Sequence, residues 1–469
     1  MRSDPQDAPY RPDAAITAIS GWIGDEVDAA QFPAQQLRFR NTRWDSAVGL
    51  GGLTDSAWTD HFGRFTPLPD NLPRPLALKY HGHQFRVYNP EIGDGRGFLF
   101  AQLRDSQDRL LDLGTKGSGR TPYSRTADGR LTLKGAVREI LATEMLEALG
   151  VYTSKTLSVV ETGEELWRGD EPSPTRSAVM VRLGHSHIRV GSFQRLAVLG
   201  ETGHLAQLVD YCLAQYPGAL PPVDAPGRDQ PAVILLHQAT ERLADLAASY
   251  MVAGFVHGVL NTDNIAITGE SFDYGPWRWL PIWDPAFTAA YFDQNGLYAF
   301  GRQPEAIRWN LGQLAMALRP LVEAEPLIAA LDRFGSCYQA AMVRRFCWRL
   351  GVASRGQEAD TALIEAAEQA MRQDKMGPDQ FFHRHRGARR AAGPMADALA
   401  TYQPIGQPDP MWDRETPESL LIDEVEEIWS AIATRDDWEP LACKIASIRQ
   451  LGQALGEPPV PAGHLPTQS

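Results

Sequence analysis

The sequence predicts an α+β fold with an antiparallel sheet and one helix in its first half and mostly helices in its second half. Three observations predict this class. Short apolar runs alternate with turns between residues 84 and 183, which is typical of strands. One long stretch in which apolar residues recur with the period of a helix interrupts these runs. From residue 232 onward this helical spacing of apolar residues dominates. A chain of 469 residues is longer than a domain with one hydrophobic core usually is, so we expect more than one structural unit.

The composition is that of a soluble globular protein, with 43% hydrophobic and 22% charged residues. A formal net charge of −13 argues against a surface that coats nucleic acid. The acidic N-terminus resembles neither a secretory signal nor a transit peptide, and no apolar run approaches a membrane span. The four cysteines stand far apart, which indicates reduced thiols. We therefore expect a cytoplasmic protein without nucleic-acid or membrane partners.

The first half is predicted to form a sheet with one inserted helix. The runs "QFRVY", "FLFAQL" and "LLDLGTK" indicate three strands of an antiparallel meander between residues 84 and 116. The helix follows in "LTLKGAVREILATEMLEALG", where apolar residues fall four apart and Gly150 stands at the C-terminal cap. The runs "TLSVVET" and "SAVMVRL" add two further strands. Five strands with a helix after the third are the layout of the small lobe of a protein kinase.

The second half follows the order of a kinase large lobe. A proline-rich loop at 216–231 precedes a helical pattern at 232–253, and this helix leads into "HGVLNTDN", which begins at His257. The sequence thus predicts a protein-kinase-like bilobal fold with N- and C-terminal extensions. The predicted parts are an N-terminal wrapping region at 1–78, a small lobe at 79–190, a large lobe with the catalytic loop and metal site at 191–345, and a helical C-terminal region at 346–469.

A glycine-rich loop, "NPEIGDGRGF", is the first candidate for ligand binding. Gly93, Gly95 and Gly97 lack Cβ atoms, so their backbone N–H groups could approach a phosphate closely. Arg96 adds a guanidinium group that can donate to the same anion. A plain glycine hairpin without a ligand is the alternative.

Basic residues continue beyond this loop. Lys116 ends the third predicted strand, where kinase-like folds place the lysine that neutralises nucleotide phosphates, and Glu139 on the following helix is its preferred ion-pair partner. A solvated lysine at a strand end is the alternative. The segment "KGSGRTPYSRTADGR" is rich in glycine and arginine, and Arg182 and Arg189 extend the basic character, which suits a polyphosphate.

The stretch "HGVLNTDNIAITGESFDYGPW", residues 257–277, has the order of a kinase catalytic centre, but its base position holds Val259. A valine cannot accept a proton, and Asp263 is the only nearby carboxylate able to replace the base. Asn264 and Asp273 offer oxygen ligands that suit Mg²⁺ or Mn²⁺. A structural turn rich in Asp and Asn is the alternative.

The motifs "GDGR", "KGSGRTPYSR", "DGR", "SHIR", "HGVLNTDN", "DYGP" and "YAFGRQP" occur in the order found in the selenoprotein O family, known as YdiU in bacteria. The chain resembles this family of kinase-fold protein adenylyltransferases between residues 80 and 318. The resemblance implies that ATP binds in an inverted orientation. AMP would then be transferred to Ser, Thr or Tyr hydroxyls of proteins, and pyrophosphate would leave.

The resemblance also implies roles for individual residues. The implied ATP contacts are Gly93, Gly95, Arg96, Lys116, Asp128, Gly129, Arg182 and Arg189, with Glu139 supporting Lys116, Asp263 as proton acceptor, and Asn264 and Asp273 as ligands of Mg²⁺ or Mn²⁺. An inverted nucleotide would place its α-phosphorus, and not its γ-phosphorus, at the reacting position. The position of the kinase base would then have no hydroxyl acceptor of a γ-phosphoryl group nearby. UMP transfer from UTP is a variant of this function. A phosphoryl-transferring kinase and a non-catalytic, ATP-binding pseudokinase scaffold are the alternatives.

Overall fold

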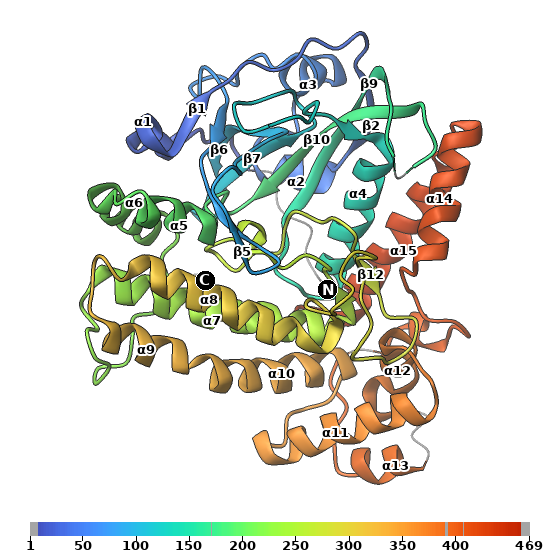
Figure 1. Cartoon of the computed structure of the whole chain (residues 1–469). Helices are drawn as coiled ribbons and strands as arrows, with labels where there is room; N and C mark the ends of the chain where they lie inside the picture. The colour runs from blue at the N-terminus through green and yellow to red at the C-terminus, as the bar shows by residue number, and fades with distance from the viewer. Residues whose placement is uncertain (1–7, 170, 390–392, 407, 461–469) are drawn as a thin grey trace.

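A computed structural model of the chain describes residues 8–169, 171–389, 393–406 and 408–460. It is a mixed α/β structure in which an antiparallel sheet occupies the first 184 residues and helices dominate the remainder (Figure 1). Within the described ranges, no helix is long and apolar enough to cross a membrane.

The sheet has eight strands, and the main path runs in the order β1-β3-β6-β7-β10-β9-β2 with β8 paired to β10. All of its pairings are antiparallel. Its strands are β1 (Gly24–Glu26), β2 (Gln36–Arg40), β3 (Leu76–Leu78), β6 (Gly97–Arg104), β7 (Leu110–Lys116), β8 (Leu131–Thr132), β9 (Lys155–Leu166) and β10 (Thr175–Gly184). Every residue of β7 is buried because both faces of the sheet are covered there.

The first 78 residues contribute strands to this sheet. The predicted five-stranded sheet did not include them. They supply β1, β2 and β3 as well as helix α3 (Asp55–Phe62), which covers the outer face through Trp58 and Phe62. The short elements η1 (Ala15–Ala18), α1 (Ser20–Ile23) and α2 (Thr42–Ala47) belong to the same part. The added strands have only three to five residues, so they contain no apolar alternation long enough to be recognised.

The prediction of one strand over "QFRVY" was wrong. These residues form part of a separate two-stranded hairpin, β4 (Gly82–Gln84) and β5 (Val87–Asn89). Its turn residues Phe85 and Arg86 have φ angles of 50° and 64°, the left-handed region that tight hairpin turns require. Such turns favour glycine and asparagine, so a Phe-Arg turn gives no sequence signal, and contacts elsewhere in the molecule must hold it.

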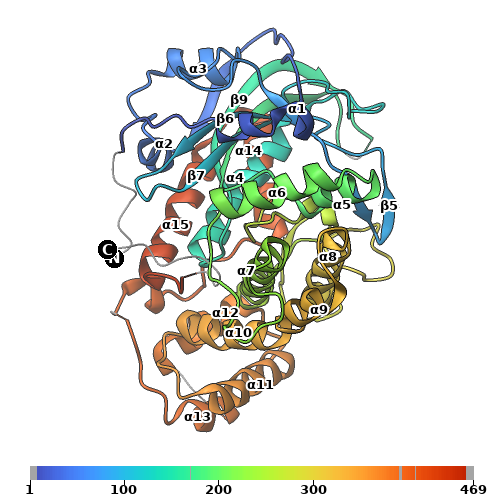
Figure 2. The ribbon, with the colours of Figure 1, turned by 90° about the vertical axis from the view of Figure 1, so that its left-hand side faces the viewer.

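Helix α4 (Leu133–Ala148) is the predicted helix of the first half. Thr132 caps its N-terminus by accepting a hydrogen bond from the Gly135 N–H, and Gly150 follows its end with a φ of 74°. One side of α4 packs on the sheet. Helices α14 (Ile422–Arg435) and α15 (Glu439–Leu455) lie along its other side, as both ribbon views show (Figures 1 and 2).

An ion pair fastens α15 to α4. Arg449 donates to both carboxylate oxygens of buried Glu144, at 2.9 and 2.7 Å, and Asn41 donates to the same carboxylate at 3.0 Å. Arg449→Met is expected to lower the free energy of unfolding by about 2 to 3 kcal/mol, because Glu144 would remain buried with a weakened partner set. Urea denaturation measures this change.

Two control variants separate the Arg449 ion pair from a general charge effect. The exposed Arg435→Met should change stability by less than about 0.5 kcal/mol. The double variant Glu144→Met/Arg449→Met should recover part of the loss, because it leaves no unpaired buried charge. A single Arg449→Met variant as stable as the parent would contradict the expected role of this contact.

The helical part is organised around α7 (Pro231–Ala253), which is buried along most of its length. Its neighbours are α6 (Thr202–Gln215), α8 (Gln303–Leu318), α9 (Ala324–Asp332) and α10 (Phe334–Leu350), while α5 (Val190–Val198) contacts α6 and α8. Gly254 ends α7 in the left-handed conformation, with a φ of 67°, and β11 (Phe255–Val256) then leads into the 257–277 segment. The predicted helix at 232–253 is confirmed.

The remaining elements complete the second half. They are η2 (Thr262–Asn264), β12 (Arg278–Trp279), which pairs with β11, η3 (Phe300–Arg302), α11 (Gln357–Gln373), α12 (Pro378–His385), η4 (Arg386–Ala388), α13 (Pro394–Leu399) and η5 (Pro410–Asp413). Helices α10 to α13 share a smaller apolar core of their own. The 216–231 stretch contains no helix or strand before α7 begins, as its prolines predict.

Candidate functional site

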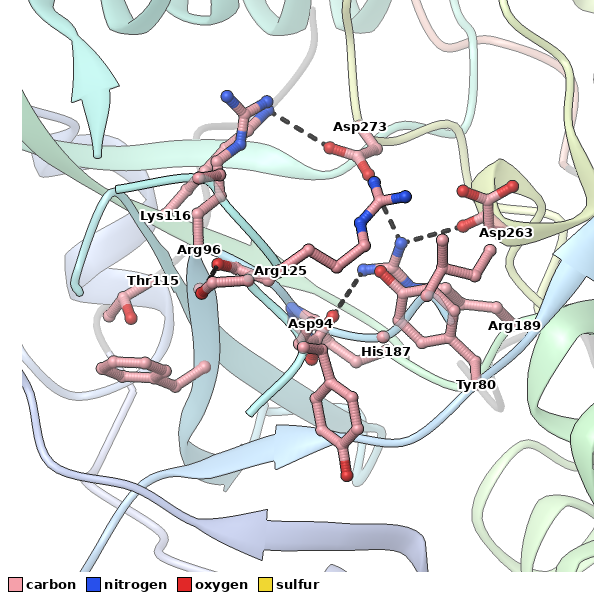
Figure 3. Close-up of a pocket in the computed structure, with 18 of the residues that line it drawn as sticks. Tyr80, Asp94, Arg96, Thr115, Lys116, Arg125, His187, Arg189, Asp263 and Asp273 are labelled. Atoms are coloured by element: carbon pink, nitrogen blue, oxygen red, sulfur yellow. Dashed lines mark hydrogen bonds and ion pairs between the residues drawn. The ribbon is translucent and has the colours of Figure 1, made fainter. Parts of the chain in front are cut away.

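A cavity of about 370 Å³ opens where the sheet meets the 257–277 segment (Figure 3). Six stretches of chain form its wall: the hairpin region, the glycine loop of residues 92–98, the end of β7, the loop of residues 123–127, the end of β10 with the residues after it, and the 257–277 segment. Its lining includes Tyr80, Gln84, Gly93, Asp94, Gly95, Arg96, Thr115, Lys116, Tyr123, Arg125, Arg182, His187, Arg189, Asp263 and Asp273.

Lys116 lies at the end of β7 and is buried. Its ammonium forms an ion pair with Glu139 of α4 and a second one with Asp273 at 3.2 Å. Arg182 donates to the other oxygen of Glu139 at 3.2 Å. Glu139 is only 2% exposed, so α4 supplies a fixed carboxylate that orients two cations toward the cavity.

Asp273 stands between three cations. It contacts Lys116 at 3.2 Å, Arg182 at 3.5 Å and Arg189 at 3.3 Å, and its backbone has a φ of 61°. Burial alone would raise the pKa of Asp273, but Lys116, Arg182 and Arg189 hold that pKa well below its ordinary value. Asp273 is therefore an ionised carboxylate at neutral pH.

The guanidinium group of Arg189 lies between Asp94, Asp263 and Asp273 (Figure 3). It pairs with Asp94 at 3.0 Å, donates to the backbone carbonyl of Asp263 at 2.8 Å, and lies over the Tyr80 ring with its guanidinium carbon 4.4 Å from the ring centre. The second oxygen of Asp94 accepts from the Leu78 N–H at 3.1 Å. These contacts fix the guanidinium group of Arg189 while leaving it on the cavity wall.

Asp263 lies in η2, beside Arg189. Burial raises the pKa of its carboxyl group from an ordinary value near 3.8 to about 6. Oδ2 accepts a hydrogen bond from the Gln84 amide at 3.3 Å, whereas Oδ1 is buried and has no hydrogen-bond partner among the described residues. A buried carboxylate with one unpaired oxygen on a cavity wall is suited to accept a proton from a bound group.

Asn264 and Asp273 carry the oxygen atoms that could hold a cation. The Asn264 amide nitrogen donates to the Val259 carbonyl at 3.0 Å, so its Oδ1 is left for another partner. No group of three or more His, Cys, Asp or Glu side chains forms a metal site among the residues that the structure describes. Asp273 lines the cavity, whereas Asn264 is not among the lining residues. A magnesium ion commonly uses one or two protein oxygens with phosphates and water, and the amide and carboxylate oxygens of these residues are of the type that such a site uses.

Asp128 and Gly129 follow Ala127, which lines the cavity, but they themselves do not line it. Asp128 forms an ion pair with Arg168 at 2.8 Å and faces a neighbouring groove. Gly129 has a φ of 73°, and a Cβ there would lie 2.2 Å from the Gly119 carbonyl oxygen. Glycine at 129 is thus required by the packing of its own loop.

The two histidines of "GHSHIR" have structural partners. His185 contacts Glu270 at 2.7 Å, and His187 contacts Asp112 at 3.0 Å. Both imidazole rings therefore already have a carboxylate partner.

The model of the family described as "Protein adenylyltransferase SelO" matches residues 11–394. The chain belongs to the SelO family. Three relatives named "Protein nucleotidyltransferase YdiU" are similar along nearly their whole length. The protein from Synechococcus elongatus is 43% identical over 96% of each chain, and that from a Synechocystis species is 42% identical over 92% of this chain and 96% of its own. The protein from Gloeobacter violaceus is 40% identical over 94% and 95%.

Membership of the SelO family makes this protein an enzyme of the nucleotidyltransferase class. The family match starts at residue 11, so it includes β1, β2 and β3, and it extends well beyond the 80–318 span recognised from motifs. Every segment that lines the cavity lies inside the match, whereas α14 and α15 lie after its end.

Several residues that line the cavity of this SelO-family member were not predicted as site residues from the sequence. Asp94 stands between two glycines, where a carboxylate is ordinarily solvated, and only its contact with Arg189 gives it a role at the site. Arg125 belongs to a recognised motif, and Figure 3 shows it reaching into the cavity. Tyr80 and Gln84 belong to the "YHGHQF" stretch, which contains no pattern that indicates chemistry. Only the folded structure, which places Tyr80 and Gln84 in the same cavity as Asp263, identifies them as site residues.

Proposed function

We propose that this SelO-family enzyme transfers AMP from ATP to Ser, Thr or Tyr hydroxyls of other proteins and releases pyrophosphate. One observation carries the proposal: Asp263, a buried carboxylate with an unpaired oxygen, shares a single cavity with Lys116, Arg182 and Arg189. Cations for a polyphosphate and an acceptor for a hydroxyl proton are what nucleotidyl transfer needs. The family description as a protein adenylyltransferase favours AMP as the transferred group.

In the proposed step, the acceptor hydroxyl oxygen attacks the α-phosphorus of ATP and forms the new P–O bond. The bond from this phosphorus to the oxygen that bridges to the β-phosphate breaks, and pyrophosphate leaves with its electron pair. The hydroxyl proton moves to Asp263. Lys116, Arg182 and Arg189 bind phosphate oxygens and neutralise the charge that grows on the leaving group, while Glu139 keeps the first two in place.

Asn264 and Asp273 would hold Mg²⁺ or Mn²⁺ next to the phosphates. When bound, such a cation neutralises phosphate charge and so favours displacement at phosphorus. Gly93, Gly95 and Arg96 line the same cavity and would contact the nucleotide from the glycine loop. Asp128 and Gly129, next to Ala127, would contact it at the edge of the cavity.

Val259 supports an inverted nucleotide within a protein-kinase-like bilobal arrangement. A kinase has at this position the base that serves the acceptor of the γ-phosphoryl group. A valine side chain cannot take that role, whereas the carboxylate of Asp263 lies on the cavity wall. We therefore expect the α-phosphorus, not the γ-phosphorus, to react. UTP bound in the same way would transfer UMP through the same step.

The position of a radioactive label tests this function. The enzyme is incubated with Mg²⁺ and an unfolded acceptor, reduced and carboxymethylated α-lactalbumin, together with ATP labelled at the α- or the γ-phosphate. Label from the α-phosphate is expected on the acceptor and on the enzyme itself, and label from the γ-phosphate is expected in pyrophosphate. Protein labelled only from the γ-phosphate would indicate a kinase. ATP binding without any labelling would indicate a scaffold, and faster labelling from UTP would indicate UMP transfer.

A further inference from the structure

The hairpin β4–β5 lies against the residues that lead into Asp263. The backbone N–H of His83 donates to the Thr262 hydroxyl at 2.7 Å, and the N–H of Phe85 donates to the Asn261 side chain at 2.9 Å. The approach is close, because a Cβ on Gly82 would lie 2.8 Å from the Thr262 hydroxyl oxygen. Figure 2 shows β5 beside α5 and α8. Chain segments about 180 residues apart are thus held together beside two residues of the cavity wall, Gln84 and Asp263.

Gln84 is the hairpin residue that reaches Asp263. Its amide nitrogen donates to Oδ2 of Asp263 at 3.3 Å. Its amide oxygen accepts from the side chain of Asn89, on the paired strand, at 3.0 Å. Since an amide oxygen cannot donate, the contact with Asn89 decides that the nitrogen end of Gln84 faces the carboxylate. The orientation of Gln84 is therefore set within the hairpin itself.

The two oxygens of Asp263 have different surroundings. Oδ2 has the Gln84 amide as a donor, while the buried Oδ1 has no hydrogen-bond partner in the described part of the chain. The terminal torsion of an aspartate is broad, so a carboxylate without a fixed contact can turn either oxygen toward a bound group. A donor on one oxygen removes this freedom and leaves the other as the acceptor.

We propose that Gln84 is a positioning residue for Asp263, holding Oδ2 and so fixing the orientation of the carboxylate that accepts the hydroxyl proton. The inference rests on the proposed function, in which Asp263 accepts the hydroxyl proton. Gln84 makes no bond to the reacting atoms in this role. It acts only through the carboxylate, and Asn89 acts through Gln84.

Gln84→Met tests the role, because methionine keeps the length of the side chain and removes its donor. Transfer from α-labelled ATP to carboxymethylated α-lactalbumin is measured with Mg²⁺ across ATP concentrations. We expect kcat to fall by roughly 10- to 100-fold, the range for loss of an orienting partner, while KM for ATP changes less than about threefold. Asn89→Leu should give a smaller fall in kcat in the same direction.

Gln194→Met is the matched control. Gln194 contacts the other face of the same hairpin, where its amide nitrogen lies 2.8 Å from the His83 ring nitrogen, and it does not line the cavity. Its substitution removes a glutamine contact to the hairpin without changing Asp263. We expect kcat within about twofold of the parent enzyme. Thermal unfolding of all variants shows that each is folded.

The double variant Gln84→Met/Asp263→Asn separates this inference from the proposed function. If Gln84 acts through Asp263, the double variant transfers AMP at the same rate as Asp263→Asn alone. A multiplicative further loss, an unchanged kcat in Gln84→Met, or a loss confined to KM would each overturn the positioning role. Full activity of Asp263→Asn would instead refute Asp263 as the proton acceptor, whatever Gln84 does.

Discussion

Asp273→Asn is expected to lower AMP transfer at saturating ATP and Mg²⁺ by roughly a thousandfold, which corresponds to several kcal/mol of lost charge stabilisation. The substitution removes the negative charge that Lys116, Arg182 and Arg189 surround, and with it one oxygen ligand of the proposed cation. Both losses weaken the stabilisation of charge on the phosphate groups of ATP. Initial rates of protein labelling from α-labelled ATP measure the effect.

Asparagine is the informative replacement at position 273. The backbone there has a φ of 61°, a conformation that asparagine adopts far more readily than alanine does. The variant therefore tests the charge and not the backbone. Asp229→Asn, at a side chain that is 98% exposed in the proline-rich loop, is the matched control and should transfer AMP at the parent rate. Transfer by Asp273→Asn within tenfold of the parent would remove Asp273 from the reaction.

Asp263→Asn is expected to slow transfer by roughly 100- to 10,000-fold, the contribution of a general base, with little change in ATP affinity. The same variant should be more stable than the parent when no metal is present. Burial raises the pKa of Asp263 to about 6, so keeping this group ionised in the folded protein costs about 3 kcal/mol. Asparagine fills the same space without that cost.

The pH dependence of this stability difference follows from the sign of the shift. The pKa of Asp263 is higher in the folded chain than in the unfolded chain, where it is near 3.8. The cost of ionisation is therefore absent well below pH 3.8, grows as the pH rises toward 6, and is complete above pH 6. Urea denaturation in EDTA at pH 5 and pH 7.5 should show a larger advantage for Asp263→Asn at pH 7.5. An equal difference at both pH values would contradict a raised pKa.

Local patterns were sufficient for the regular elements with strong periodicity. Helix α4 and the glycine after it, the helix before the 257–277 segment, and the strand that ends in Lys116 appear where spacing and caps predict them. The Lys116 and Glu139 pair follows from the kinase-like order of elements, in which a lysine at a strand end pairs with a glutamate of the following helix. These features depend on residues that are close in sequence.

Features that depend on distant residues could not be predicted in this way. The turn at Phe85 and Arg86 has no favourable turn residue, and it exists because the hairpin bonds to Asn261 and Thr262. Asp94 becomes a cavity residue only when Arg189 lies beside it. Neither periodicity nor composition records which side chains meet after folding, so motif order located the site but not its full lining.

The ion pair between Arg449 and Glu144 joins residues 305 positions apart. Strands β6 and β7 pair through local contacts, whereas α4 packs on β9 and β10, which follow it in the chain. The outer side of α4 gains its packing only when α14 and α15 have been added, and the contact of Arg449 with Glu144 closes a loop of 305 residues. We therefore expect the helix that orients Lys116 to be secured late in folding, after the rest of the cavity wall has formed.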